Sequence, residues 1–290
     1  MRTVFIVNPK AGKGQGREKF IAEIEAASEK TGVPVEIYST QGSGDGEILA
    51  AQLAQEAEAR GEETRIIACG GDGTLNEVLN GAMHHAHVVI GVVPIGTGND
   101  FCRNFPEAGD FLDIEAQLTG TVMDCDAIRY SGMLDGRVQT RYCANMFNIG
   151  FDCNVVDLTA KLKTYPLLAG SMAYLMAVLC ILVRKKGADL RVELDGEVYE
   201  DGPVLLTALA NGSFCGGGVK SAPTARLDDG LMDVNIIYNV SRREFLSKFP
   251  AYSKGTHMQL PGIEKIIFAR QCRRAVITPR QGAMRLCTDG

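Results

Sequence analysis

The sequence contains no tryptophan and only four histidines, and no two of its nine cysteines form a C-x-x-C pair. Most of the cysteines lie in apolar runs, as do Cys69, Cys143, Cys180 and Cys287. This pattern predicts reduced, buried thiols rather than a disulfide framework or a zinc site. The first residues, MRTVFIVNPKAG, lack the apolar core and cleavage site of a signal peptide and are expected to form a strand. We therefore expect a cytoplasmic protein.

A strong excess of one charge is also missing. The net charge is −5 over 290 residues, and the hydrophobic and charged fractions of 46% and 22% are typical of a folded soluble protein. A nucleic-acid partner is therefore not expected. The last fifty residues differ, because they carry ten Lys or Arg against three acids. A basic surface facing anionic lipid or a nucleotide is one interpretation of this stretch, and scattered solvated charges are an equally good one.

One uncharged stretch is strongly apolar, the 19 residues 165–183, and three bases follow it. Pro166 moves any helix start to Leu167, which leaves roughly 17 residues, or about 25 Å of helix. That is short for a membrane core about 30 Å thick. We expect a helix buried within a domain, or one with a lipid-facing edge, ahead of a membrane-spanning helix.

Short apolar runs alternate with helical periodicity in the first third of the chain. Strands are expected at 3–7, 33–40, 64–69 and 88–94, with helices between them. This alternation predicts an α/β domain, doubly wound around a mainly parallel sheet, over residues 1–121. Strand-like runs with short connections then predict a mainly antiparallel β-sandwich domain over 122–290, with one long helical insert near 155–184.

Glycine and polar residues follow each expected strand of the first domain. The four segments are NPKAGKGQG (8–16), Ser39-Thr40, GGDGTLNEVLNG (70–81) and PIGTGNDF (94–101). Ligands bind at the carboxyl ends of parallel strands, and the glycines are expected to supply positive φ or close backbone approach to phosphate. Asp72 would orient Mg²⁺ or polarise a hydroxyl. Plain turns and a helix-capping hydroxyl at Thr40 are the structural alternatives.

Taken in order, these segments resemble the catalytic domain shared by diacylglycerol kinases, sphingosine kinases and bacterial lipid kinases. The matching motifs are Asn8-Pro9-x-Ala-Gly12, Gly70-Gly71-Asp72-Gly73-Thr74 with Asn76-Glu77, and Pro94-x-Gly-Thr-x-Asn-Asp100. In the second half, NGSFCGGG (211–218) and APTARLDDGLMDV (222–234) resemble two further motifs of that family. The resemblance covers nearly the whole chain.

The resemblance implies that ATP and Mg²⁺ are the cofactors. Nucleotide would bind at Asn8, Pro9, Lys10, Ala11, Gly12, Thr40, Gly70, Gly71, Asp72, Gly73, Thr74, Leu75, Asn76 and Thr97. In bacterial members a structural Mg²⁺ lies in the second domain, and residue by residue its ligands would be the Asp229 carboxylate and the carbonyls of Arg226 and Leu231. The alternative for 228–230 is a simple hairpin turn.

The proton acceptor is where the sequence departs from the family. Family members carry a Glu in an Asp-Gly-Glu near the end of the second domain, whereas this sequence ends in Thr288-Asp289-Gly290. Asp72 and Asp289 are therefore the candidate catalytic carboxylates. Whether a Glu follows Gly290 in the native chain is left open.

The resulting hypothesis is an ATP-dependent lipid kinase that acts on the hydroxyl of diacylglycerol or a related lipid, bound peripherally at a membrane surface. An NAD-kinase-like enzyme and a non-catalytic nucleotide- and lipid-binding protein are the alternatives. The sequence determines neither the lipid headgroup nor the oligomeric state, and it leaves a homodimer open.

Overall fold

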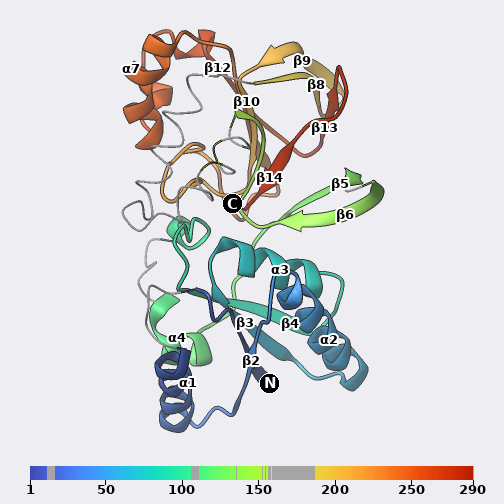
Figure 1. The fold of residues 1–290 in the computed structure, drawn as a ribbon, viewed down its shortest axis with the longest axis vertical. Coiled ribbons are helices and arrows are strands. Elements are labelled where there is room, and N and C mark those ends of the chain that lie inside the picture. Colours follow the sequence, from blue (N-terminus) through green and yellow to red (C-terminus); the bar gives the residue numbers. More distant parts are fainter. Residues whose placement is uncertain are drawn as a thin grey trace. The chain divides into compact units, whose positions relative to one another are not determined.

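The computed structural model describes residues 1–11, 17–105, 111–134, 136–151, 153, 155, 158 and 187–289. The chain divides into two compact units (Figure 1). One contains residues 1–124 with 129–143, and the other contains 125–128 with 144–290.

The N-terminal unit is built on a parallel sheet of four strands in the order β2-β1-β3-β4. Their bounds are β1 (Arg2–Val7), β2 (Val35–Ser39), β3 (Thr64–Gly70) and β4 (Val88–Pro94). Each strand coincides with a predicted apolar run, and β2 begins two residues later than expected. All neighbouring strands pair in parallel, so their carboxyl ends meet at one edge of the sheet.

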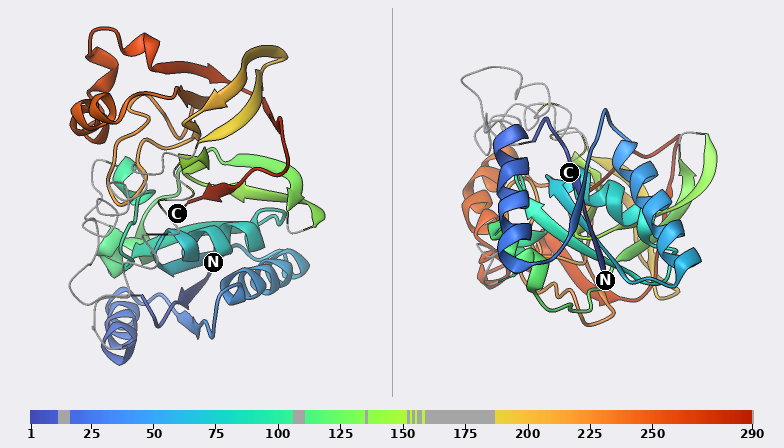
Figure 2. Two further views of the ribbon diagram at one scale, coloured as in Figure 1. Left: turned by 45° about the horizontal axis from the view of Figure 1, so that its top comes forward. Right: turned by 90° about the horizontal axis from the view of Figure 1, so that it is seen from below.

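Helices cover both faces of this sheet (Figure 2). Their bounds are α1 (Arg17–Thr31), α2 (Asp45–Arg60), α3 (Asp72–Ala82) and α4 (Ile114–Thr119). Strand β1 explains why both faces are covered, because its successive side chains point to opposite faces of the sheet. Val4 and Ile6 pack in one core cluster with residues of α2 and α3, whereas Phe5 and Val7 pack in another with residues of α1 and α4. The doubly wound arrangement is therefore confirmed.

A two-stranded hairpin, β5 (Ile128–Leu134) and β6 (Arg137–Cys143), belongs almost entirely to the N-terminal unit. Asn80 of α3 holds it, since its Nδ2 donates to the Tyr142 carbonyl at 2.9 Å and its Oδ1 accepts the Tyr142 N–H at 2.8 Å. From its strand pattern alone the hairpin was assigned to the second domain. The boundary at residue 121 stays a prediction.

The C-terminal unit contains a five-stranded sheet, β12-β11-β10-β7-β14, and a three-stranded sheet, β13-β8-β9. The strands are β7 (Met146–Gly150), β8 (Ala188–Leu194), β9 (Glu197–Val204), β10 (Leu206–Ala210), β11 (Met232–Ile237), β12 (Ile267–Cys272), β13 (Ala275–Pro279) and β14 (Leu286–Thr288). All of these pairings are antiparallel. The predicted mainly antiparallel sandwich is therefore confirmed.

Helix α7 (Arg242–Ser253) was not predicted, because only the 155–184 insert was expected to interrupt the strands. A signal for it exists in the sequence. Ser241 is followed three residues later by Glu244, which is the pattern of a capping box, and the Ser241 hydroxyl accepts the Glu244 N–H at 3.2 Å.

Two sequence predictions concern the thiols and the long apolar stretch. No disulfide joins the cysteines that the structure describes. Cys69 and Cys143 are buried as predicted, Cys287 is only half-buried, and Cys180 lies outside the described residues. The apolar stretch 165–183 also lies outside them. Within the described ranges, no helix has the length and apolar character needed to span a membrane.

Candidate active site

A cavity of about 360 Å³ opens beside the carboxyl ends of β1, β2 and β3. It is lined by Asn8, Pro9, Lys10, Thr40, Gln41, Gly42, Ser43, Gly71, Gly73, Thr74 and Glu77. These residues come from the segments that follow the three strands and from the first turns of α3. The polar loops thus gather at one edge of the sheet, as expected for parallel strands.

Only some of the residues that were predicted to bind nucleotide line the cavity. Ala11, Gly70, Asp72, Leu75, Asn76 and Thr97 are not among the lining residues, and Gly12 lies outside the described residues. Conversely, Gln41, Gly42 and Ser43 line the cavity although only Thr40 was predicted from that loop. The same carboxyl-edge rule would have found them, had it been applied to the whole loop after β2. That the cavity holds nucleotide stays a prediction.

Asn8 joins the loop after β1 to the start of α3. Its Oδ1 accepts the Lys10 N–H at 3.0 Å, and its Nδ2 donates to the Thr74 hydroxyl at 3.3 Å. Its backbone N–H donates to the Cys69 carbonyl at 2.9 Å, which continues the pairing of β1 with β3. Asn8 therefore fixes one wall of the cavity.

The glycines of the third and fourth segments, 70–81 and 94–101, serve close approach rather than positive φ. A Cβ at Gly96 would lie 2.2 Å from the Gly71 Cα, so the two loops cross backbone to backbone. Gly71 itself has φ −101°, outside the left-handed region. A Cβ at Gly73 would meet no atom within 4 Å, and Gly73 lines the cavity. The open space at Gly73 lets a ligand reach the backbone of the first turn of α3.

Asp72 is the first residue of α3 and holds the loop that follows β4. Its Oδ2 accepts the Asn99 N–H and its Oδ1 the Asp100 N–H, each at 2.7 Å. Burial, reinforced by the Asp100 carboxylate, raises the pKa of Asp72 to about 6, although the backbone hydrogen bonds oppose this rise. The side chain thus acts on the neighbouring loop, while the cavity wall itself is formed by Gly71 and Gly73.

Asn99 stabilises the same loop from within. It adopts φ 55°, a left-handed conformation that asparagine tolerates better than most residues. Its Nδ2 donates to the carbonyls of Pro94 at 2.8 Å and Gly96 at 3.0 Å. The loop is therefore fixed at both ends, by its own asparagine and by Asp72.

Glu77 was noted in the sequence only as part of a motif, yet it shapes the loop after β2. Its carboxylate accepts the N–H of Gly44 at 2.8 Å and of Gly46 at 3.0 Å, at the N-terminus of α2. A carboxylate is favourable there because the first N–H groups of a helix have no partner within it. Glu77 thereby positions the loop that supplies Gln41, Gly42 and Ser43.

Three residues that were predicted to bind nucleotide lie outside the cavity lining. Leu75 is buried in the core, at 4% exposure. The Asn76 amide donates to the Tyr142 carbonyl at 3.2 Å, so this side chain helps to hold β6. Thr97 is exposed.

The predicted metal region lies in the C-terminal unit, in the turn before β11. The Asp229 Oδ1 accepts the Leu231 N–H at 3.0 Å, and the Asp126 Oδ2 accepts the Gly230 N–H at 2.7 Å, whereas the Arg226 side chain binds Asp228. Among the described residues, no three His, Cys, Asp or Glu side chains converge. Mg²⁺ typically takes one or two carboxylates and completes its shell with other oxygens. That this turn holds such an ion stays a prediction.

Asp289 anchors the start of β7. Its carboxylate accepts the N–H groups of Ala144 at 2.9 Å, Asn145 at 2.8 Å and Met146 at 3.2 Å. Its own N–H donates to the Met146 carbonyl at 3.0 Å, and the residue is 6% exposed. The structure therefore gives Asp289 a task in holding β14 against β7, and its catalytic role stays a prediction.

Comparisons with known proteins cover both units. Residues 2–130 match the family model of the diacylglycerol kinase catalytic domain, and residues 145–290 match that of the YegS C-terminal NAD kinase beta sandwich-like domain. A diacylglycerol kinase of Staphylococcus carnosus is 32% identical over 93% of this chain and 82% of its own length. One of Bacillus subtilis is 30% identical over 89% of this chain and 80% of its own length.

Solved structures extend the likeness to the fold. A diacylglycerol kinase structure from Bacillus anthracis strain Sterne aligns with a TM-score of 0.70 at 21% identity, over 100% of this chain and 89% of the other. Another structure from the same strain aligns over the same shares with a TM-score of 0.74 at 24% identity. At these identities the likeness shows the fold alone.

Proposed function

This chain belongs to the diacylglycerol kinase catalytic-domain family, and we propose that it transfers the γ-phosphoryl group of ATP to the hydroxyl of diacylglycerol. Family membership makes it a kinase, and a kinase implies the use of ATP. The proposal depends chiefly on the cavity at the carboxyl ends of β1, β2 and β3, whose walls are polar loops and bare glycine backbone.

We assign the phosphates of ATP to the α3 side of this cavity. The backbone at Gly73 is open to a ligand, and the N-terminus of an 11-residue helix carries positive potential. Thr74 supplies a hydroxyl and Lys10 an ammonium group. The loop 40–43 then contacts the remainder of the nucleotide.

Asp72 is a positioning residue in this proposal. It fixes the loop 96–101 beside the start of α3, because its Oδ2 accepts the Asn99 N–H and its Oδ1 accepts those of Asp100 and Phe101. Mg²⁺ bound with ATP would neutralise phosphate charge during transfer. We assign Asp72 to orienting that ion, and Asp229 with the carbonyls of Arg226 and Leu231 to holding a structural one.

The lipid hydroxyl must give up a proton during transfer, and a carboxylate is the acceptor we expect. The Asp289 oxygens already accept three backbone N–H groups. Asp289→Asn separates the two roles. Loss of kcat together with loss of its pH dependence would support a proton acceptor, whereas lower stability with an unchanged pH profile would support an anchor.

The acceptor is insoluble in water, so we propose that the reaction takes place at the cytoplasmic surface of a membrane and contributes to phospholipid metabolism. The test is transfer of radiolabel from γ-labelled ATP, with Mg²⁺, to lipids in mixed micelles, with NAD offered as the acceptor in a parallel soluble assay. Label in phosphatidic acid is the expected result. If instead only NAD becomes labelled, or ATP binds without turnover, the proposal is wrong and the corresponding alternative holds.

A further inference from the structure

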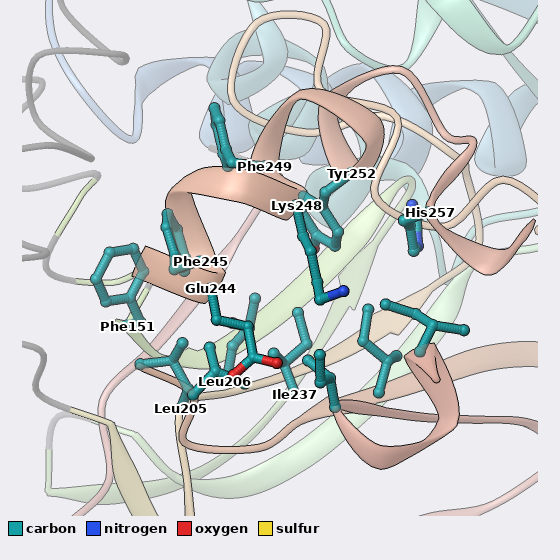
Figure 3. Close-up of a pocket in the computed structure, with 14 residues that line it drawn as sticks. Phe151, Leu205, Leu206, Ile237, Glu244, Phe245, Lys248, Phe249, Tyr252 and His257 are labelled. Atoms are coloured by element: carbon teal, nitrogen blue, oxygen red, sulfur yellow. The ribbon is translucent and has the colours of Figure 1, made fainter. Parts of the chain in front are cut away.

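A second cavity, of about 60 Å³, lies beneath α7 in the C-terminal unit (Figure 3). Among the described residues that line it, only Glu244 and Lys248 carry charge at neutral pH. The rings of Phe245, Phe249 and Tyr252 cover it, although none of the 12 residues of α7 is buried. The first cavity differs, because polar contacts hold its loops and these contacts extend beyond its walls.

The loop 40–43, which lines the first cavity, is fixed at both ends. At its start the Thr40 N–H donates to the Val7 carbonyl at 3.0 Å. At its end it runs into the first turn of α2, where the Asp45 carboxylate accepts the Gln41 N–H at 2.6 Å. The middle of the loop is exposed, so its position depends on where α2 begins.

The first turn of α2 is itself held by two side chains from other elements. The Glu77 carboxylate accepts the Gly46 N–H at 3.0 Å. The next residue, Glu47, pairs with Arg141 of β6, whose Nη1 and Nη2 donate to the two carboxylate oxygens at 3.1 and 2.7 Å. These two side chains are 28% and 34% exposed. A bidentate pair of this kind fixes the orientation of both groups as well as their separation.

Strand β6 is thereby joined to both helices that border the cavity. Tyr142, next to Arg141, is held by Asn80 of α3 through two hydrogen bonds. Helices α2 and α3 approach closely, because a Cβ at Gly81 would lie 2.3 Å from the Glu47 carbonyl oxygen. Loss of the Arg141 guanidinium would therefore release the α2 side of the cavity and leave the α3 side attached.

We infer that Arg141 is a positioning residue for ATP, because its ion pair with Glu47 holds the first turn of α2, and with it the loop 40–43, in the conformation that binds the nucleotide. The inference rests on the proposed function, which assigns ATP to this cavity. Both ends of the β5–β6 hairpin continue into residues of the C-terminal unit. The affinity for ATP therefore depends on a segment that lies outside the cavity lining.

Arg141→Met tests the inference by removing the guanidinium while keeping an unbranched side chain. We expect the Kd for ATP in calorimetry, and the KM for ATP, to rise about 5-fold. The kcat at saturating ATP should stay unchanged, because Arg141 only positions the loop. A wild-type Kd in the folded variant overturns the inference.

Arg2→Met is the matched control. Arg2 also makes a bidentate pair, with Glu36 at 2.6 and 2.8 Å, and it donates to Glu56 in the second half of α2 at 2.8 Å. It begins β1, at the edge of the sheet opposite to the cavity. We expect Arg2→Met to lower the melting temperature and to leave the Kd for ATP unchanged. An equal rise of Kd in both variants would mean general destabilisation and would overturn the inference.

A double-mutant cycle shows whether the ion pair itself carries the effect. Glu47→Gln keeps the size of the side chain and removes its charge. We expect Glu47→Gln with Arg141→Met to raise the Kd no further than either change alone, about 5-fold, because both remove one interaction. A multiplied rise of about 25-fold overturns the pairing as the cause. Arg141→Lys keeps the charge without the planar fork and should be intermediate.

Hydrogen exchange of the wild-type protein gives a measurement that needs no folded variant. Coupling is reciprocal, so ADP should slow exchange in peptides from 129–143 as well as in those from 40–47. Slower exchange in 40–47 alone overturns the inference. A wild-type protein that binds neither ATP nor ADP overturns the proposed function, whereas one that binds ATP equally in all variants overturns this inference alone.

Discussion

The two cavities of this chain differ in what forms their walls. In the N-terminal unit the walls are polar loops and glycine backbone, held by Asn8, Asp72 and Glu77 through hydrogen bonds of 2.7 to 3.3 Å. In the C-terminal unit the walls are side chains, and the covering helix has no buried residue. The first cavity can change shape only by breaking hydrogen bonds, whereas the second can open by sliding rings apart.

The walls of the first cavity match the chemistry of the proposed nucleotide. A triphosphate has a fixed pattern of acceptors, so its site requires donors at fixed positions. The second cavity is lined mainly by apolar side chains, which offer no such pattern of donors. The two cavities therefore differ in rigidity and in charge, and substitutions in each of them test this difference.

The largest expected effect is at Asp72. Asp72→Asn keeps the size of the side chain but replaces one acceptor with a donor that faces a backbone N–H. We expect kinase activity to fall at least about 100-fold. Asp113→Asn is the matched control, because Asp113 only caps α4 and asparagine caps equally well. An Asp72→Asn enzyme with more than a tenth of wild-type activity would contradict the assignment.

The raised pKa of Asp72 also predicts how stability depends on pH. Its pKa rises from 3.8 in the unfolded chain to about 6 in the fold, which corresponds to about 3 kcal/mol. The fold favours the protonated form, so this stabilisation is present below pH 3.8 and is lost as pH rises through 6. Urea unfolding should therefore show wild type losing about 3 kcal/mol relative to Asp72→Asn between pH 3 and 7. Parallel pH curves for the two proteins would refute this.

Gly96→Ala should break the crossing of the two glycine loops. The added Cβ would lie 2.2 Å from the Gly71 Cα, a backbone atom that cannot rotate away. We expect a loss of about 3 kcal/mol in the free energy of unfolding, measured by urea denaturation. A loss below about 1 kcal/mol would mean that the loops can separate easily.

Gly73→Ala tests the same loop where space is open. The methyl group meets no protein atom within 4 Å, and alanine favours the helix, so the melting temperature should be equal or higher. The methyl group would point toward the position that we assign to phosphate, so the Kd for ATP should rise about 10-fold in calorimetry. Unchanged ATP affinity in this stable variant would exclude the proposed nucleotide position.

The smallest effect is expected at the loose cover of the second cavity. Phe249→Ala removes a partly buried ring of α7 and should cost less than about 1.5 kcal/mol. Phe5→Ala, in the sheet core at 0% exposure, should cost about 3 to 5 kcal/mol. Equal losses in urea unfolding would show that α7 is packed as tightly as the core, and would remove the contrast between the two regions.

Local patterns predicted much of the architecture and the location of the first cavity. Apolar runs and helical periodicity are properties of neighbouring residues, so the strands of the N-terminal sheet were found within a few positions. The carboxyl-edge rule then brought Asn8, Thr40 and Gly73 together, because parallel strands end on one side. Helix α7 was missed although its capping signal, Ser241 with Glu244, is local.

Roles within the sites were less predictable, because they depend on partners distant in the chain. Asn76 fits a nucleotide motif, yet its amide binds Tyr142. Asp289 was expected near the chemistry, yet its carboxylate binds N–H groups 143 to 145 positions away. Hydrophobic periodicity and residue spacing do not predict which distant backbone N–H groups will donate to a given carboxylate.

The amino-acid sequence by itself determined the fold class, the order of the strands along the chain and the edge of the sheet where polar loops gather, since these follow from hydrophobic periodicity and chain direction. Only the tertiary structure decided that Gly96 touches Gly71, that Asp72 bonds to the loop after β4, and that His257 is buried. These are contacts between separate elements, and the free energy that selects them comes from packing and hydrogen bonding across the fold.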